Sequence, residues 1–273
     1  MSKVWFITGA NRGFGRQFAE AALSRGDRVA ATSRNVGGLD EMVSEYGDLV
    51  LPLELDVTDR NGVEHAVKAA FDHFDRLDVI VNNAGYGLFG MIEEITIQQM
   101  RDQMEVNFFG LLNVTQAVLP ILRKQGSGHI IQMSTIGGVM AFSNLGAYNA
   151  SKWAVEGLSE ALAQEVGQFG INVTLIEPGL FDTDWRGSSA VHAEPMPHYE
   201  SLREAAKKRA ADPSMIGDPK AAGQAILTIA DAEKPPLRVF FGKRPVEAVP
   251  AAYEARLKGW DEWKHVSLAA NGH

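Results

Sequence analysis

Tyr148 and Lys152 lie four residues apart in the segment Tyr-Asn-Ala-Ser-Lys. On a helix, residues i and i+4 share one face, so this spacing places a phenol beside an ammonium group. A free tyrosine has a pKa of about 10, and a cation within a few ångströms favours the phenolate and lowers that pKa. The pair therefore predicts that Tyr148 acts as a general acid or base, with its pKa lowered by Lys152. The same spacing also fits an ordinary pair on a helix surface, so the rest of the chain has to decide between the two.

A glycine-rich turn follows the first apolar run of the chain, residues 4–8. Glycines let the backbone turn tightly and approach a pyrophosphate, and the helix expected next offers free N–H groups and the positive end of its dipole. The spacing Gly-x-x-x-Gly-x-Gly differs from the usual dinucleotide fingerprint, but its place between a strand and a helix supports the same role. The predicted cofactor-binding residues of this turn are Gly9, Asn11, Arg12, Gly13, Phe14 and Gly15.

The end of the second apolar run, residues 28–32, indicates which dinucleotide is bound. An acidic residue there would bind the ribose hydroxyls of NAD, whereas a nearby arginine accommodates the 2′-phosphate of NADP. The chain continues with Ser33 and Arg34 and has no acid at this point, and Arg12 in the glycine turn could reach the same phosphate. The two arginines predict NADP(H) as the cofactor; the alternative is that both are solvated surface side chains.

Seven short apolar runs alternate with longer segments of helical periodicity. The runs lack regular polar alternation, as expected for strands buried on both faces of a parallel sheet. This alternation predicts an α/β fold of the Rossmann type, a doubly wound seven-stranded parallel sheet with helices on both faces and ligands beyond the carboxyl ends of its strands. The expected strands are residues 4–8, 28–32, 49–53, 79–81, 129–133, 172–176 and 238–241, and the expected helices include residues 14–25, 60–74, 96–124 and 148–169.

Residues 1–273 are expected to form a single dinucleotide-binding and catalytic domain, because no linker or break in composition divides them. Residues 181–219 interrupt the alternation of strands and helices just after the sixth strand. This predicts a substrate lid with a helix over residues 199–211; the alternative is a mobile surface loop. Residues 243–273 form a C-terminal extension that carries two tryptophans. Candidates for the wall of a substrate pocket are Trp185, Met196 and Tyr199 in the lid and Met133, Met140 and Phe142 around the end of the fifth strand; the alternative for the last three is core packing.

Composition narrows the classes of function. The chain has 34 acidic and 26 basic residues and a net charge of -8, which argues against a nucleic-acid partner and is normal for a cytoplasmic enzyme. It has no cysteine, so disulfides, thiolate nucleophiles and cysteine-bound zinc are excluded, and no Asp/Glu/His cluster has the spacing of metal ligands. We see no signal peptide and no run of about 18 apolar residues, and therefore expect no membrane span.

The order of the motifs along the chain resembles that of the short-chain dehydrogenase/reductase family in its compact one-domain form. The resemblance covers about residues 3–183. In chain order, its motifs are the glycine turn, Asn82-Asn83-Ala84-Gly85 after the fourth strand, Asn107 in the long helix, a hydroxyl segment after the fifth strand, Tyr148-x-x-x-Lys152, and Pro178-Gly179 with Thr183 after the sixth strand.

The resemblance implies a role for each of these residues. Tyr148 would exchange a proton with the substrate oxygen, and Lys152 would lower the pKa of Tyr148 and hold the nicotinamide ribose. Asn107 would anchor a water in a proton relay; the alternative is a polar side chain inside a helix that is bonded to the backbone. The residues implied to contact the cofactor are Asp56 and Val57 at the adenine, Asn83, Ala84 and Gly85 along its length, and Pro178, Gly179 and Thr183 at the nicotinamide carboxamide.

One position departs from the family pattern. Where the family usually has a serine thirteen residues before the catalytic tyrosine, this chain has Thr135, preceded by Ser134. Neighbouring side chains on an extended segment point to opposite faces, so only one of the two hydroxyls should face the cofactor. The ungapped spacing favours Thr135, whose hydroxyl can stabilise charge on the reacting oxygen and whose methyl group would crowd the pocket. Ser134 stays the alternative catalytic hydroxyl.

Together these expectations describe an NADP(H)-dependent oxidoreductase that interconverts a carbonyl and an alcohol, and specifically a ketoreductase. The alternatives are a catalytically silent dinucleotide-sensing protein on the same fold and, less favoured, an epimerase or dehydratase, for which the chain lacks a longer substrate domain. The expected partners are a small carbonyl or alcohol substrate and, by resemblance, further copies of the chain in a dimer or tetramer joined through residues 96–124 and 148–169. The substrate, its stereochemistry and the physiological direction stay open.

Overall fold

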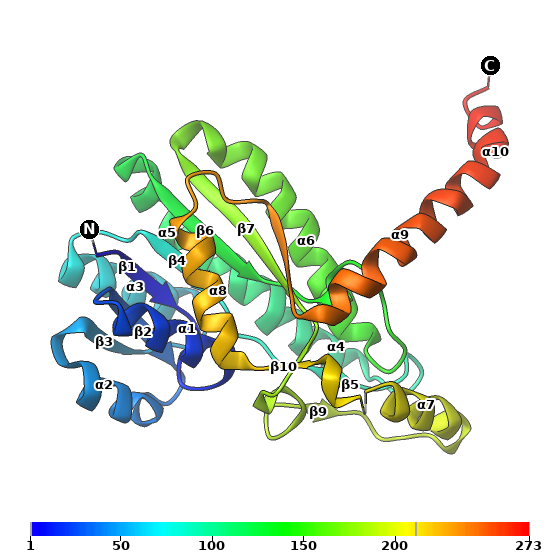
Figure 1. The fold of residues 1–273 in the computed structure, drawn as a ribbon, viewed down its shortest axis with the longest axis horizontal. Coiled ribbons are helices and arrows are strands. Elements are labelled where there is room, and N and C mark those ends of the chain that lie inside the picture. The colour runs from blue at the N-terminus through cyan, green and yellow to red at the C-terminus, as the bar shows by residue number, and fades with distance from the viewer. Residues whose placement is uncertain (1, 211, 273) are drawn as a thin grey trace.

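The computed structural model describes residues 2–210 and 212–272 and is built on a seven-stranded parallel sheet (Figure 1). In sheet order the strands are β3 (Val50–Glu54), β2 (Arg28–Ser33), β1 (Val4–Ile7), β4 (Val79–Asn82), β6 (Gly128–Met133), β7 (Ile171–Pro178) and β11 (Arg238–Phe241). Every neighbouring pair is parallel. Chain order runs outward in both directions from β1 and β4, so the predicted doubly wound sheet is confirmed, and its switch point lies between these two strands.

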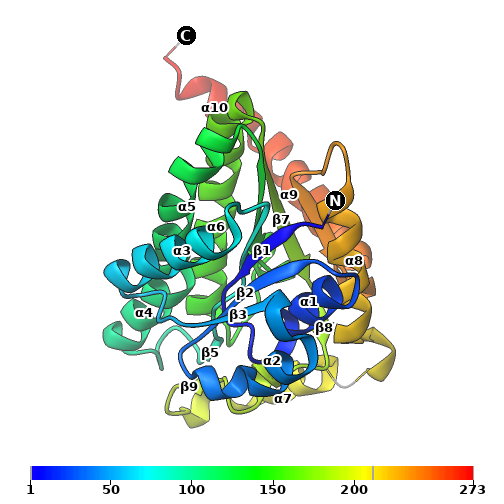
Figure 2. The same cartoon turned by 90° about the vertical axis from the view of Figure 1, so that its left-hand side faces the viewer.

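Helices cover both faces of the sheet, one group to the right of the strands in Figure 2 and the other to the left. On one face, α1 (Gly13–Ser24) and α8 (Pro219–Asp231) pack on the odd-numbered side chains of β1. On the other, α3 (Arg60–Phe74), α5 (Leu111–Gln125) and α6 (Gly146–Val166) pack on its even-numbered side chains. All four residues of β1 are fully buried, which explains why the strand is apolar throughout and does not alternate.

The helix predicted over residues 96–124 is divided by a π-helical turn. It begins as α4 (Ile97–Met104) after a capping box at Thr96, passes through the π turn Glu105–Gly110, and continues as α5. Such turns are rare and occur frequently at functional sites. By length and composition alone, the stretch Ile97–Gln125 could cross a membrane, a criterion that core helices of water-soluble proteins also meet.

Residues 181–219 fold into a layer over the carboxyl edge of the sheet. Two short parallel strand pairs form here. The pair β5 (Leu88–Phe89) with β9 (Val191–His192) joins the layer to the body, and the pair β8 (Leu180–Phe181) with β10 (Ile216–Gly217) joins the two ends of the layer to each other. The predicted lid helix is α7 (Glu200–Ala210), and residue 211 at its expected end lies outside the described residues.

The C-terminal extension is helical. It comprises α9 (Lys243–Glu262) and α10 (Lys264–Ala269), which project away from the body of the molecule (Figure 1). α2 (Asp40–Tyr46) follows β2 at the opposite edge of the sheet.

Candidate active site

A cleft of about 1400 Å³ lies at the carboxyl ends of the strands, beneath the layer formed by residues 181–219. Its walls include the glycine turn and the residues that follow β2, β3, β4, β6 and β7. Parallel α/β sheets bind ligands at this edge, next to the switch point. Of the residues predicted for catalysis or for cofactor binding, all line the cleft except Gly15 and Asn107.

Thr8 and Asn83 hold the glycine turn in shape. The Thr8 hydroxyl accepts hydrogen bonds from the backbone amides of Asn83 and Ala84, each at 2.9 Å. The Asn83 side-chain amide donates to the carbonyl oxygens of Thr8 at 2.9 Å and Gly9 at 3.1 Å. Gly9 has a φ of 66°, a conformation that favours glycine, and a Cβ on Gly15 would lie 2.9 Å from the Gly9 carbonyl carbon. The first turn of α1 therefore sits directly against this loop and presents its free N–H groups to the cleft.

The two arginines predicted to select NADP both line the cleft, in different states. Arg34 follows β2, is exposed, and forms no ion pair with any side chain in residues 2–210 and 212–272. Arg12 reaches across the cleft, where its Nη1 lies 3.2 Å from Asp184 Oδ2 and 3.3 Å from Ser188 Oγ. Because both charged side chains of this pair are partly exposed, at 48% and 39%, the pair is worth about 1 kcal/mol or less.

Helix α6 places Tyr148 and Lys152 on one face, as their spacing predicts. Lys152 Nζ lies 6.0 Å from the centre of the Tyr148 ring and donates to the Met133 carbonyl oxygen at 2.7 Å. Both side chains are buried, and burial raises the pKa of Tyr148 and lowers the pKa of Lys152 to about 8. Burial thus sets the net direction of the Tyr148 pKa in this structure, and the expected lowering by Lys152 stays a prediction. Tyr148 is a neutral phenol at neutral pH and can donate a proton.

The two hydroxyls that follow β6 point in different directions. Thr135 is extended and only 9% exposed, and its hydroxyl donates to the Pro178 carbonyl oxygen at 3.3 Å. The same hydroxyl lies near Tyr148 and lowers the pKa of the phenol, against the larger increase caused by burial. The Ser134 hydroxyl instead donates to Glu156 Oε1 on α6. The structure thus brings Thr135, and not Ser134, to the predicted acid–base residue.

Asn107 lies fully buried in the π turn and bonds to the backbone after β4. Its Oδ1 accepts from the Tyr86 amide at 3.0 Å, and its Nδ2 donates to the Tyr86 carbonyl at 3.0 Å and to Ser151 Oγ at 3.1 Å. A Cβ on Gly85 would lie 3.0 Å from Asn107 Oδ1 and 3.8 Å from Lys152 Nζ, so Gly85 borders both side chains. These contacts fit the alternative of a side chain bonded to the backbone, and the proton relay stays a prediction.

Aromatic and sulfur-containing side chains line part of the cleft, and one aromatic ring lies against Tyr148. The Trp185 ring lies 5.0 Å from the Tyr148 ring and 5.1 Å from the Phe89 ring, measured between centres. Met133, Met140 and Phe142 also line the cleft, as expected, and Phe89 was not among the predicted residues.

Met196 and Tyr199 do not line the cleft, so their prediction as pocket residues is wrong. A buried carboxylate explains their position. Glu94, whose side chain is 1% exposed, accepts from the Met196 amide at 2.7 Å and pairs with Arg203 at 2.6 Å. Tyr199 donates to the neighbouring Glu93 at 2.5 Å. The sequence could not have predicted the pair formed by Glu94 and Arg203, because no spacing rule links two residues about a hundred positions apart.

The family model described as short chain dehydrogenase matches residues 3–193. The chain belongs to this family. This short-chain dehydrogenase is 42% identical over 279 residues to the oxidoreductase BOA17 of Botryotinia fuckeliana, covering 99% of this chain and 100% of the relative. It is 39% identical over 243 residues to the 3-ketodihydrosphingosine reductase of Bacteroides thetaiotaomicron, covering 88% of each chain.

Solved structures agree with this assignment. A short-chain dehydrogenase from Streptomyces avermitilis matches with a TM-score of 0.92 at 38% identity and covers 98% of both chains. An alcohol dehydrogenase from Thermococcus sibiricus, complexed with 5-hydroxy-NADP, matches with a TM-score of 0.74 at 25% identity, over 89% of this chain and 97% of that one. The chain is thus a member of an oxidoreductase family, and structures with a similar fold have been solved with a bound nucleotide.

Proposed function

We propose that this short-chain dehydrogenase is an NADP(H)-dependent oxidoreductase that interconverts a ketone or aldehyde and an alcohol, and that it works as a ketoreductase. The observation that carries the proposal is the group formed by a neutral Tyr148, the Thr135 hydroxyl and the Lys152 ammonium on one wall of the cleft. When bound, NADPH would supply the hydride that reduces the carbonyl carbon. The chain's own residues supply the proton and hold the oxygen.

The protonation states suit the reductive direction. Burial keeps the proton on Tyr148, which can therefore give it to a developing alkoxide. The Thr135 hydroxyl, next to the Tyr148 hydroxyl, can donate a second hydrogen bond to the same oxygen. A lysine with a pKa of about 8 releases its proton more readily than an ordinary lysine and can restore the proton on Tyr148.

Substituting Tyr148→Phe tests this role. The variant should lose about 10²- to 10⁴-fold in kcat/KM for a carbonyl substrate, the usual contribution of a general acid, while its Kd for NADPH stays within about threefold. If the wild-type protein binds NADPH but reduces no compound in a broad carbonyl panel, the alternative of a silent dinucleotide-sensing protein gains support.

The preference for NADP rests on Arg12 and Arg34. No carboxylate lies among the cleft residues directly after β2, Arg34 is unpaired in the described part of the chain, and the weak pair between Arg12 and Asp184 leaves that guanidinium open to exchange with a phosphate. The fit of a pyrophosphate is supported by the free amino end of α1 and by Gly13, which lines the cleft and has open space where a Cβ would lie.

A paired fluorescence titration with NADPH and NADH tests the preference. We expect NADPH to bind at least about tenfold more tightly, a difference of about 1.4 kcal/mol. Replacing Arg12 and Arg34 together by alanine should abolish this ratio. Arg76→Ala is the matched control, because that arginine precedes the amino end of β4, away from the cleft at the carboxyl ends of the strands, and pairs with Asp78. Equal binding of the two nucleotides by the wild type would contradict the proposal and leave the fold assignment intact.

The lining of the cleft supports an apolar substrate. Phe89, Met140, Phe142 and Trp185 line the cleft, and the Trp185 ring lies against the Tyr148 ring. A relative at 39% identity is called a 3-ketodihydrosphingosine reductase, so ketones with long alkyl chains are the first compounds to test. A preference for short polar aldehydes would contradict this part of the proposal.

We further propose that the protein forms a homo-oligomer. Large apolar side chains are exposed on the helices expected to pair, with Phe109 at 45% and Trp153 at 40%. They are also exposed in the projecting C-terminal extension, with Trp260 and Trp263 at 65% each. Light scattering after size exclusion should give a dimer or tetramer, and replacing both extension tryptophans by alanine should weaken it. A wild-type monomer would contradict the proposal.

A further inference from the structure

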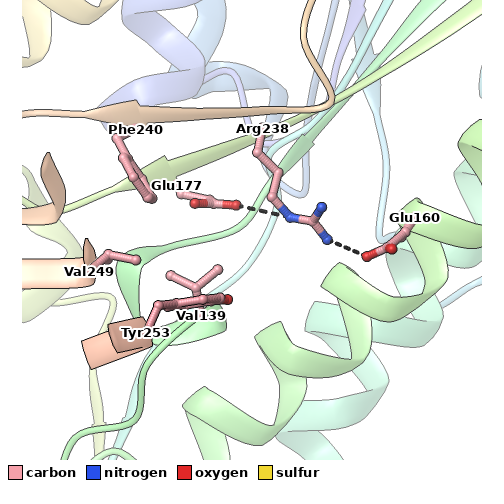
Figure 3. Close-up of a pocket in the computed structure, with 7 residues that line it drawn as sticks. All are labelled: Val139, Glu160, Glu177, Arg238, Phe240, Val249 and Tyr253. Carbon is pink, nitrogen blue, oxygen red and sulfur yellow. Dashed lines mark hydrogen bonds and ion pairs between the residues drawn. The ribbon is translucent and has the colours of Figure 1, made fainter. Parts of the chain in front are cut away.

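Arg238 and three glutamates form a cluster of charged side chains next to the carboxyl ends of β6 and β7, which are followed or formed by Thr135 and Pro178. It borders a second cavity of about 440 Å³, separate from the main cleft, and Figure 3 shows Arg238 reaching between two carboxyl groups at its wall. The cavity is lined by Val139, Glu160, Glu177, Arg238, Phe240, Val249 and Tyr253.

Three carboxyl groups share the single guanidinium of Arg238. Its Nε donates to Glu156 Oε2 at 3.0 Å, its Nη2 donates to Glu160 Oε2 at 2.7 Å, and Glu177 Oε1 lies 3.5 Å from Nε. The side chain of Glu160 is 54% exposed, whereas those of Glu156 and Glu177 are 7% and 0% exposed. Two buried carboxylates beside one cation would be costly, so the cluster favours the uptake of a proton.

Glu177 is the member that carries this proton. Neither of its oxygens accepts a hydrogen bond from the residues that the structure describes, and burial and the neighbouring Glu156 raise its pKa to about 8. A protonated Glu177 can donate to Glu156, whose carboxyl lies within hydrogen-bond reach. Glu156 also accepts from Ser134 and Arg238, whereas Glu177 has no such donors among the described residues.

Glu156 connects this cluster to the proposed active site in two ways. It lies one helical turn after Lys152 on α6, and its charge raises the pKa of that lysine against the larger lowering caused by burial. Through Ser134 it also holds the backbone directly before Thr135. The groups that face Lys152 are Tyr148 and Glu156 from α6, the Met133 carbonyl from β6, and Asn107 from the π turn across Gly85.

We propose that Glu156 is a positioning residue of this enzyme, which keeps Lys152 in its ammonium form and fixes the Ser134–Thr135 segment, while Glu177 holds the proton that lets a single charge stay buried there. The inference rests on the proposed function for its effect on turnover. Its effect on Lys152 can be measured without turnover.

Substituting Glu156→Gln tests the inference, because the amide keeps the size and removes the charge. The alkaline limb of the pH profile for carbonyl reduction, where Lys152 loses its proton, should move to lower pH by about one unit, with kcat reduced at pH 8 and KM within about threefold. The pH dependence of the NADPH Kd should show the same displacement, and this readout does not need a substrate.

Three further variants separate charge from structure. Glu160→Gln removes a carboxylate from the same guanidinium but leaves Glu156 in place, so both pH midpoints should stay unchanged. Ser134→Ala breaks the hydroxyl contact and keeps the charge, so it should lower kcat a few-fold without moving either midpoint. Arg238→Gln removes the opposing cation and should move the midpoints to higher pH, which keeps the test open if Glu156→Gln fails to fold.

The results distinguish two kinds of failure. If no carbonyl compound is reduced but the Kd midpoint moves as expected in Glu156→Gln, the proposed function fails and the effect of Glu156 on Lys152 stands. If Glu156→Gln, or Arg238→Gln in its place, leaves the midpoints of both profiles unchanged, the positioning role is overturned.

Discussion

Substituting Lys152→Met should stabilise the cofactor-free protein while it abolishes turnover. Lys152 is 5% exposed, and burial lowers its pKa from 10.5 to about 8. An unfolded chain would bind this proton at the ordinary pKa, so below pH 8 the unfolded state holds the proton more tightly than the folded state. The buried ammonium therefore costs stability at neutral pH, and that cost is lost as the pH rises from 8 to 10.5.

The magnitude follows from the difference between the two pKa values. Each pKa unit corresponds to 1.36 kcal/mol, so the full cost below pH 8 is about 3 kcal/mol. Methionine has a similar length and no charge, but it cannot donate to the Met133 carbonyl oxygen, which loses its 2.7 Å hydrogen bond at a cost of about 1–3 kcal/mol. We expect a net gain of about 1 kcal/mol at pH 7, or about 2–4 °C in Tm.

The change with pH is more informative than the gain itself, because the lost hydrogen bond affects all pH values alike. The difference in unfolding free energy between variant and wild type, measured by urea denaturation, should fall by about 3 kcal/mol between pH 7 and pH 10.5. Lys68→Met is the control, because the Lys68 side chain is 71% exposed and its removal should change stability by no more than about 0.5 kcal/mol at either pH. A difference that stays constant over this range would refute the reasoning.

Three further outcomes are expected. Thr135→Val should lower kcat/KM by about 10²-fold, as loss of a donor to the reacting oxygen does, and Ser134→Ala should cost at least tenfold less in the same assay. Burial lowers the pKa of His129 from 6.5 to about 4, so the unfolded chain binds a proton at this histidine at higher pH than the folded protein does. The wild type should therefore lose about 3 kcal/mol of unfolding free energy as the pH falls from 6.5 to 4. In urea titrations at these two pH values, His129→Gln should not show this loss. Trp185→Ala should raise KM for an apolar ketone at least about tenfold, with the Kd for NADPH within threefold by fluorescence titration.

The sheet could be predicted because its strands are buried on both faces. The apolar run expected at residues 28–32 lies within β2, and the run expected at residues 238–241 coincides with β11. The helix expected over residues 60–74 coincides with α3. The two-residue strands β5, β8, β9 and β10 could not be predicted in the same way, since they are too short to show any periodicity. They form only where residues 181–219 fold over the carboxyl ends of the main strands.

Sequence spacing also determined which residues gather at the cleft, but not their protonation states. The four-residue interval between Tyr148 and Lys152 correctly placed them on one helix face, and proximity alone suggested a phenol with a lowered pKa. The structure reverses that sign because both side chains are buried where the ends of β6 and β7 meet the lid, with Trp185 against the phenol. Burial at this point depends on residues from three distant parts of the chain, and no local pattern records it. A motif therefore predicts which groups meet, whereas the complete fold determines which of them holds the proton.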